Sequence, residues 1–368
     1  MQLSNRAIRN LLTALAILLA VGAAACGDDG GETVESTSFD DEQIVVDYAD
    51  QVVIPTYELL DTRAGELQTA VDALAGDPTD ANLEAARDAW VSTREPWEQS
   101  EASLFGPVDS NGYDPALDSW PVNRSDLEQV LAGDDTIDQA YVEGLDASLK
   151  GFHTIEFLLF GDGGTKTAAD LSDRELDYLT ATTADLKRTT GLLATSWTDG
   201  VDGQSAYREV FTTAGADGNQ AYPSLSAAGQ EITTGMITIL DEVANGKIAD
   251  PFDNRDTTLV ESQFSYNSLT DFKNNIIGVQ NAYLGKADAA GTSGKGLTAF
   301  VAAQDADLDA RVKAEIQAAI DALDAVPEPF RDAITDDAGR AKIEEAITAI
   351  STVQATVEQD VQPLVTGQ

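Results

Sequence analysis

Apolar residues recur every three or four positions through most of the chain after residue 43, which is the spacing of one face of an α-helix. No segment alternates apolar and polar residues clearly enough to predict a β-hairpin. Because an amphipathic helix must bury its apolar stripe against other helices, such chains fold into helical bundles. The sequence therefore predicts an all-α fold, with two four-helix-bundle-like halves packed together over residues 44–200 and 201–368.

The same spacing predicts helices over the ranges 42–60, 62–75, 80–95, 138–160, 172–197, 205–242 with a break near 215–218, 264–283, 294–326 and 336–363. Pro55 is expected to kink or end the first of these helices. Ser172 and Glu175 have the spacing of a capping box, which predicts a helix start. Residues 106–125 contain several Gly and Pro breakers and predict a long loop. Loops of that length are often functional, and we expect this one to lie near the candidate site.

The first 25 residues have the pattern of an export signal. Arg6 and Arg9 precede a short apolar run over residues 11–21, and small residues follow at 22–25. The run is shorter than a typical membrane-spanning helix, although an uncut N-terminal anchor is the alternative. The pattern predicts that residues 1–25 are a signal peptide and that the protein is exported.

Cys26 is the only cysteine in the chain, and it follows three alanines in a pattern that resembles the bacterial lipoprotein box. A lone cysteine can form no internal disulfide, so lipidation is the better explanation for it. We therefore expect residues 26–43, which are rich in Gly and acidic residues, to be the lipidated cysteine and a flexible tether. Gly27 favours anchoring in the outer membrane, facing the periplasm. The membrane, reached through Cys26, is one expected partner.

The chain is strongly acidic, with 22 Lys and Arg against 64 Asp and Glu and a net charge of −42. A surface of this sign repels nucleic acid, which excludes that class of partner. The acidic residues are spread along the whole chain, a distribution typical of adaptation to high salt. A surface that collects cations is the alternative interpretation.

The segment 151–161 carries the candidate chemistry. It contains His153, the only histidine, and Glu156 lies three residues later on the same helix face. The surrounding residues are apolar on nearly all sides, so the helix should be buried. A buried carboxylate needs a partner or a proton, and no Lys or Arg lies within the segment. The partner must come from elsewhere in the fold or be a metal, unless the His–Glu pair is purely structural.

A second polar cluster follows an aromatic stripe. Arg94, Glu98 and Glu101 recur at helical spacing among Trp90, Trp97 and Phe105. Arg94 and Glu98 could form an ordinary surface ion pair, which would contribute little. The alternative is that all three residues line the same cavity as the His–Glu pair. Asp118 and Trp120, in the long loop, could then close it.

Gly151, His153 and Glu156 match the GxHxxE motif, and the chain thereby resembles the imelysin-like family over roughly residues 44–365. Residues 97–101, 105–107, 118–121, 261–267, 271–272 and 275–278 are similar to other blocks of that family. The resemblance implies two four-helix-bundle-like halves, an envelope location and a link to iron uptake. It also implies a metal or ligand site at His153 and Glu156, which by the same resemblance Ser262, Ser265 and Asn267 would face.

Carboxylates with one imidazole suit iron or another divalent metal better than a soft thiolate site would. The leading hypothesis is therefore an envelope-anchored, non-enzymatic metal-binding lipoprotein that acts with components of iron uptake. Its ligands would be His153 and Glu156, with Glu98 and Glu101 as further ligands and Arg94 as a counter-charge.

Two other functions stay open. A metal-dependent peptidase is the first, although a zincin needs two histidines on one helix, and this chain has one. The sequence also lacks the Gly-x-Ser-x-Gly elbow of serine hydrolases. The second is a structural or partner-docking lipoprotein, in which the His–Glu pair is only part of the core.

Overall fold

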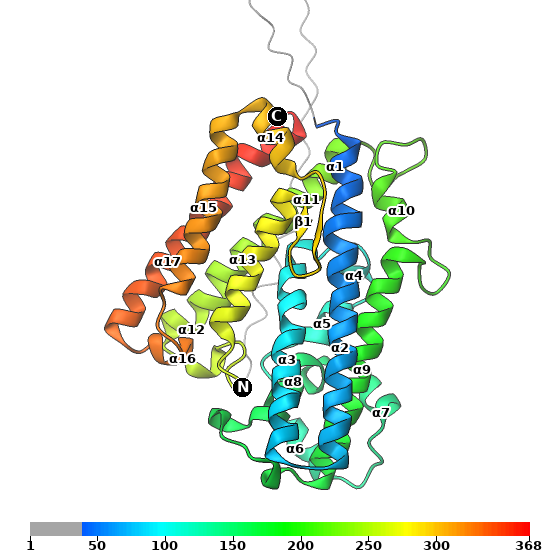
Figure 1. The fold of residues 1–368 in the computed structure, drawn as a ribbon, viewed down its shortest axis with the longest axis vertical. Helices are drawn as coiled ribbons and strands as arrows, with labels where there is room; N and C mark the ends of the chain where they lie inside the picture. Colours follow the sequence, from blue (N-terminus) through cyan, green and yellow to red (C-terminus); the bar gives the residue numbers. More distant parts are fainter. Residues whose placement is uncertain (1–38) are drawn as a thin grey trace, which may run out of the picture. The chain divides into compact units, whose positions relative to one another are not determined.

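Long helices form throughout residues 39–368, the part of the chain that the computed structural model describes (Figure 1). The elements up to residue 200 are α1 (Glu42–Asp47), η1 (Tyr48–Val53), α2 (Ile54–Gly76), α3 (Asp80–Ser100), η2 (Glu101–Ser103), α4 (Pro107–Ser110), α5 (Tyr113–Asp118), α6 (Arg124–Ala132), α7 (Gln139–Glu143), η3 (Ala147–Leu149), α8 (Gly151–Phe160), η4 (Asp162–Gly164), η5 (Ala168–Asp170) and α9 (Asp173–Thr198).

The elements that follow are α10 (Tyr207–Thr212), α11 (Leu225–Asp241), η6 (Glu242–Ile248), α12 (Ala249–Asn254), η7 (Thr257–Leu259), α13 (Ser268–Leu284), β1 (Lys286–Ala287), β2 (Thr292–Ser293), α14 (Leu297–Gln304), α15 (Ala306–Asp324), α16 (Phe330–Ala333), α17 (Asp337–Thr356), η8 (Val357–Val361) and α18 (Gln362–Thr366). β1 and β2 pair in antiparallel fashion over two residues each. The all-α prediction is confirmed, apart from this short ribbon.

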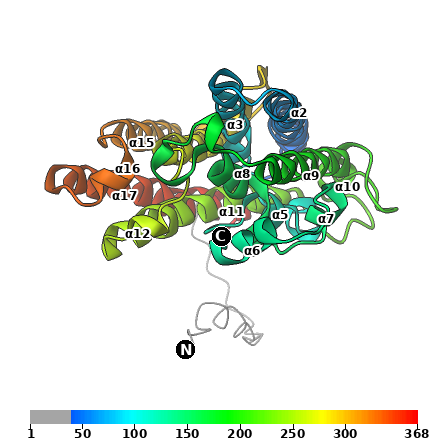
Figure 2. The same ribbon diagram turned by 90° about the horizontal axis from the view of Figure 1, so that it is seen from below.

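The helices form two groups that meet along α3 and α13. In the first group α2 packs against α3 and α9, and α8 packs against both α3 and α9. In the second, α15 packs against α17 and α13, and α11 contacts α13 and α17. Figure 2 shows α8 and α11 near the middle, between α9 and the pair α15 and α17. Since α3 packs along α13, the two groups share one long interface, and the predicted division near residue 200 stays a prediction.

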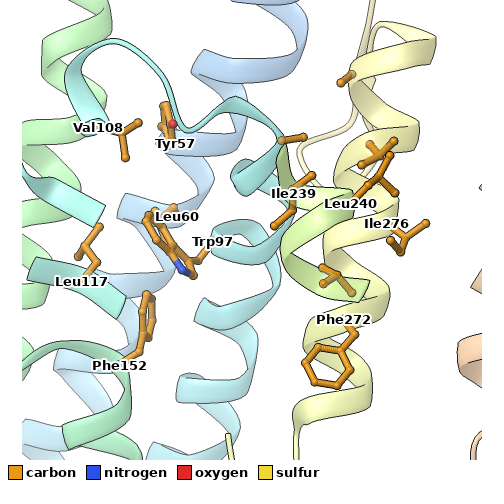
Figure 3. Packing of buried hydrophobic residues seen from close by; sticks show 14 of the residues in the cluster. Tyr57, Leu60, Trp97, Val108, Leu117, Phe152, Ile239, Leu240, Phe272 and Ile276 are labelled. Atoms are coloured by element: carbon orange, nitrogen blue, oxygen red, sulfur yellow. The ribbon is translucent and has the colours of Figure 1, made fainter. Parts of the chain in front are cut away.

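A single apolar cluster runs through both groups. Figure 3 shows Trp97, Leu117 and Phe152 from the first group, with Ile239 and Phe272 from the second. All of these side chains are fully or almost fully buried. The candidate site therefore lies within a closely packed interior rather than in an open cleft.

The predicted helix over 138–160 is wrong, because the structure divides it into α7, η3 and α8. The division falls at Gly151, whose φ is +78° and which begins α8. A Cβ at this position would stand 2.3 Å from the carbonyl oxygen of Leu117. The close approach of the two backbones requires glycine here and sets the angle at which α8 enters the site.

Proline has less effect on the helices than we expected. Pro55 does not end the first helix: it lies at the start of α2, directly after the π-helical turn η1, and the helix continues to Gly76. A π-helical turn changes the hydrogen-bond register, which lets the chain accept a residue without an N–H. Pro96 likewise lies inside α3, which extends past it to Ser100. The capping box of Ser172 and Glu175 is present, as predicted.

The predicted signal peptide and Cys26 lie outside the described residues. The predicted tether enters the described region only over residues 39–43. There Phe39 is buried against Phe300, and α1 begins at Glu42. Within residues 39–368, no helix combines the length and the apolar character that crossing a membrane requires.

Candidate metal centre

Helix α8 places His153 and Glu156 together at the interface between the two groups of helices. Their side chains are 3% and 1% exposed, and His153 Nδ1 lies 3.1 Å from Glu156 Oε2. The helical i, i+3 spacing that the sequence analysis singled out produces this contact directly. It fixes the orientation of the imidazole ring, because one of the two ring nitrogens is held by the carboxylate.

The partner of the buried Glu156 carboxylate is a loop 108 residues further along the chain. Oε1 of Glu156 accepts hydrogen bonds from the backbone N–H of Phe264 at 3.0 Å, the backbone N–H of Ser265 at 2.8 Å and the Ser265 hydroxyl at 2.7 Å. Ser262 and Tyr266 flank these donors with φ of +50° and +63°. Non-glycine residues adopt such angles only where the surroundings hold them. The loop is thus shaped to bind Glu156.

The second ring nitrogen of His153 faces two other carboxylates. Nε2 lies 3.1 Å from Asp118 Oδ1 and 3.8 Å from Glu261 Oε1. Although the first distance is short, Nε2 makes no well-aligned hydrogen bond within the described part of the chain. One ligand atom from each of the three residues lies within 4.8 Å of the others, so together they could hold a metal ion. Asp118 was expected near this site, whereas Glu261 was not singled out from the sequence.

Arg94 is the central cation of the site and is fully buried. It contacts Asp118 at 2.5 Å, Glu261 at 2.9 Å and Asp271 at 3.6 Å, and it forms an ion pair with Glu98. The rings of Phe152 and Trp90 lie 5.0 and 5.8 Å from the guanidinium carbon. The Arg94–Glu98 pair expected from the i, i+4 spacing is therefore present, but it lies in the interior and not on the surface.

Glu98 and Glu101 are bound mainly by Lys247 and Asn275. The Lys247 ammonium lies 2.7 Å from Glu101 Oε2 and 3.3 Å from Glu98 Oε2. The Asn275 amide donates to the same two oxygens at 2.5 and 2.7 Å. Both glutamates thus belong to the buried network, but the structure places them outside the group around His153 Nε2. Sequence reasoning missed Lys247 altogether, and it noted Asn275 only as part of a block that is similar to the family.

The remaining predicted site residues lie close by, in supporting positions. The Trp97 indole donates to Asp118 Oδ2 at 2.6 Å. Ser262 and Asn267 donate to the two oxygens of Asp271, at 2.5 and 2.8 Å. Trp120 is half-buried and lines, with His153, Glu156 and the loop 260–264, a cavity of about 10 Å³. Such a volume holds about one water molecule or ion.

Acidic groups outnumber basic groups in this interior. Arg94, Lys247 and His153 face a larger set of carboxylates, namely Glu98, Glu101, Asp118, Glu156, Glu261 and Asp271. Burial raises the pKa of Asp271 to about 8 against the opposing effect of Arg94. Burial and the neighbouring Glu98 also raise the pKa of Glu101. The excess negative charge must be met either by protons or by a bound cation.

His153 and Asp118 shift each other's pKa in opposite directions. Burial alone would lower the pKa of His153, but Asp118 and the hydrogen bond to Glu156 raise it to about 10. Burial would raise the pKa of Asp118, but Arg94 and His153 outweigh it and hold that pKa well below its usual range. Without a metal ion, both ring nitrogens of His153 therefore carry a proton at neutral pH, and the imidazole is positively charged.

We expect the metal-free protein to lose stability as the pH rises from about 6.5 to 10. The folded chain keeps the His153 proton over this window while the unfolded chain releases it, so unfolding becomes easier at higher pH. One proton corresponds to a slope of at most about 1.4 kcal/mol per pH unit. Urea denaturation in a chelating buffer at pH 7, 8 and 9 measures it. His153→Gln should lower the slope between pH 8 and 9 by the contribution of this one proton, and identical profiles for both proteins would contradict the assignment.

Comparisons with known proteins agree with this architecture. The family model described as Imelysin matches residues 53–357. Iron-regulated protein A of Synechococcus elongatus is 38% identical over 323 residues, which is 88% of this chain and 86% of that protein.

Two solved structures share the fold. An iron-regulated protein A precursor from Parabacteroides distasonis is 29% identical, with a TM-score of 0.75, over 86% of this chain and 94% of its own. An imelysin-like protein from Psychrobacter arcticum has a TM-score of 0.72 over 89% of this chain and 98% of its own, and at 13% identity it shows the fold alone. Since the family model matches most of the chain and a relative exceeds 30% identity along its length, this protein belongs to the imelysin family.

Proposed function

We propose that this protein binds a single metal ion, iron in particular, through His153, Asp118 and Glu261, and that it acts in iron uptake without being an enzyme. We further propose that it is exported and anchored through Cys26 to the outer membrane, where it would meet other components of iron uptake. The observation that carries the proposal is the fixed imidazole: Glu156 holds Nδ1, and Nε2 faces two carboxylates.

This arrangement has the form that metal-ligating histidines usually take. In such sites one ring nitrogen is hydrogen-bonded to a carboxylate, which sets the tautomer and leaves the other nitrogen free to bind the metal. Glu156 is in turn held by three donors from the loop 264–265. A metal ion at Nε2 would displace the His153 proton and offset part of the buried negative charge.

The ligand set differs from the one that spacing suggests. Glu156 has both carboxylate oxygens engaged, one by His153 and the other by the loop, so we assign it a positioning role. Glu98 and Glu101 are engaged by Lys247 and Asn275. Asp118 and Glu261 take their place as ligands, and Arg94 forms an ion pair with each of these carboxylates.

The chemistry of the donors and the relatives support iron. Two carboxylates and one imidazole suit iron, manganese or zinc, and no cysteine thiolate lies within residues 39–368 to favour a softer metal. The similar protein of Synechococcus elongatus bears the name iron-regulated protein A. A regulated response to iron in a relative is consistent with a role for this chain in handling the metal.

The geometry favours binding over peptide hydrolysis. A serine protease requires the histidine between the serine and the carboxylate. Here Ser265 donates to Glu156, and Glu156 in turn contacts His153, so the carboxylate lies in the middle. The cavity beside His153, of about 10 Å³, also has no room for a peptide. These features support the non-enzymatic hypothesis over the peptidase alternative.

The experiment is thermal unfolding of the metal-stripped protein in high salt, with Fe²⁺, Fe³⁺, Mn²⁺ or Zn²⁺ added in turn. A metal present at 100 times its Kd should stabilise the folded state by about 2.7 kcal/mol and raise the Tm accordingly. His153→Gln, Asp118→Asn and Glu261→Gln should each abolish that rise, because each removes one ligand.

The matched control is Asp72→Asn, which removes an exposed carboxylate far from the site in sequence and should keep the full rise. A rise that is the same in the control and in the three ligand variants would show binding to the acidic surface only. No rise with any metal would favour the structural lipoprotein instead.

A further inference from the structure

Lys247 is buried among Glu98 and Glu101, which the proposed metal does not use, and Glu261, which it does. We propose that its ammonium group occupies the position of a second metal ion, and thereby limits this centre to one ion. This inference rests on the proposed function, but a separate experiment tests it. Lys247 would then be the residue that determines the nuclearity of the site.

The chain places Lys247 on the core-facing side of its helix. Leu240, Val243 and Ala244 are buried, and Lys247 follows at the next position of that stripe, with 2% of its side chain exposed. It lies in the π-helical turn η6, and π-helical turns are frequent at functional sites. A lysine at such a position must be compensated by opposite charge, because an isolated buried ammonium is strongly unfavourable.

The groups around the ammonium are those of a hard-metal site. Its nitrogen lies 2.7 Å from Glu101, 3.3 Å from Glu98 and 3.3 Å from Glu261. Glu98 and Glu101 are three residues apart on α3 and η2, so both point the same way. Asn275 adds an amide within hydrogen-bond distance of both, and its carbonyl oxygen is buried without a hydrogen bond among the described residues. Several carboxylates together are ligands that Mg²⁺, Mn²⁺ and Fe²⁺ accept.

Glu261 joins this position to the group around His153. Its Oε1 lies 3.8 Å from His153 Nε2 and 3.3 Å from the Lys247 nitrogen. Its Oε2 also lies 3.3 Å from Lys247, but it makes no hydrogen bond within residues 39–368 and is buried. A carboxylate shared between two cation positions is the arrangement that two-metal centres use, with ions about 3.5–4 Å apart. Here one of the two cations is the covalently attached ammonium.

The presence of an ammonium group in place of a second metal ion has a chemical consequence. A two-metal centre can activate water or clamp both oxygens of a displacement reaction, whereas an ammonium group offers no open coordination position. Lys247 also cannot dissociate, so it holds Glu261 in place while the single metal enters and leaves. With Lys247 in place, the site is therefore a one-metal carrier site and not a carboxylate-bridged, two-metal catalytic centre.

The test is the number of metal ions bound per chain. The unsubstituted protein, the Lys247→Met variant and the control variant Lys273→Met would be loaded with Mn²⁺, passed through gel filtration in high salt and analysed for metal content. Lys273 forms an exposed ion pair with Asp324, so its replacement removes a charge outside the site. Lys247→Met should bind one metal ion more per chain than the unsubstituted protein, and Lys273→Met should bind the same number as the unsubstituted protein.

A second variant locates the added ion. Glu101→Gln combined with Lys247→Met removes a ligand of the new position and should return the metal content to that of the unsubstituted protein. An unchanged metal content in Lys247→Met would overturn the inference. The proposed function fails if the unsubstituted protein binds no metal ion. The present inference is tested independently of that result, because it requires Lys247→Met to bind one ion more than the unsubstituted protein in either case.

Lys247→Met could be insoluble without metal, because it leaves buried carboxylates without their cation. Refolding from urea with and without Mn²⁺ then decides the question. Recovery that depends on Mn²⁺ is expected, since the ion replaces the ammonium. Failure to refold in either buffer would show that Lys247 is a structural cation only and would overturn the inference.

Discussion

Replacing Arg94 with methionine should lower the free energy of unfolding by about 3–5 kcal/mol. The guanidinium is fully buried and contacts the carboxylates of Glu98, Asp118, Glu261 and Asp271. Methionine has a similar length but no charge, so the substitution removes from these buried carboxylates a cation that contacts all four. Breaking a buried ion pair by removing one partner is much more costly than losing a surface pair.

Urea denaturation at pH 7 of Arg94→Met and of Arg63→Met provides the comparison. Arg63 forms an exposed ion pair with Glu66 at the same kind of helical spacing, and its loss should change the free energy of unfolding by less than about 1 kcal/mol. The loss in free energy of unfolding caused by Arg94→Met should also become smaller at low pH, because the carboxylates that Arg94 contacted take up protons. Equal losses for the two variants would contradict the description of Arg94 as the central cation.

Gly151→Ala should cost about 3 kcal/mol of stability and also abolish metal binding. The residue has a φ of +78°, which for alanine alone costs on the order of 1–3 kcal/mol. The added Cβ would lie 2.3 Å from the carbonyl oxygen of Leu117, so one of the two backbones must move. Because Leu117 precedes Asp118 and Gly151 begins the helix of His153, this movement separates two proposed ligands.

Gly76→Ala is the matched control. Gly76 lies at the end of α2, and a Cβ there would meet no atom within 4 Å. Its replacement should be neutral, or stabilising by up to about 1 kcal/mol, since alanine restricts the unfolded chain more than glycine does. Thermal unfolding of both variants, with and without the metal, separates the two effects. A Gly151→Ala protein that keeps the metal-dependent rise in Tm would show that the glycine serves packing only.

The features that depend on neighbours in the sequence were the predictable ones. Helical spacing gave the all-α fold, and the i, i+3 spacing placed His153 beside Glu156 at 3.1 Å. The i, i+4 spacing likewise paired Arg94 with Glu98. In each case the contact lies within one or two turns of a single helix, where the backbone geometry alone determines which side chains meet.

The features that depend on distant residues were not predictable from spacing. Glu261 and Lys247 lie more than 90 residues beyond His153 in the chain, and the packing of α11 and α13 against α3 and η2 brings their segments to the site. Lys247 could have been noticed as a charge on an otherwise apolar stripe after Val243 and Ala244. Its neighbour Gly246 instead suggests a helix end. The division of the helix before Gly151 also depends on a tertiary contact, the backbone of Leu117.

The most direct test of the central claim is a crystal structure of the protein grown with iron, with diffraction data collected on both sides of the iron absorption edge. The account predicts one anomalous peak, at bonding distance from His153 Nε2 and from carboxylate oxygens of Asp118 and Glu261, with Glu156 still hydrogen-bonded to Nδ1. A peak that lies on the acidic surface alone, or His153, Asp118 and Glu261 in the same arrangement with no peak beside them, would contradict it.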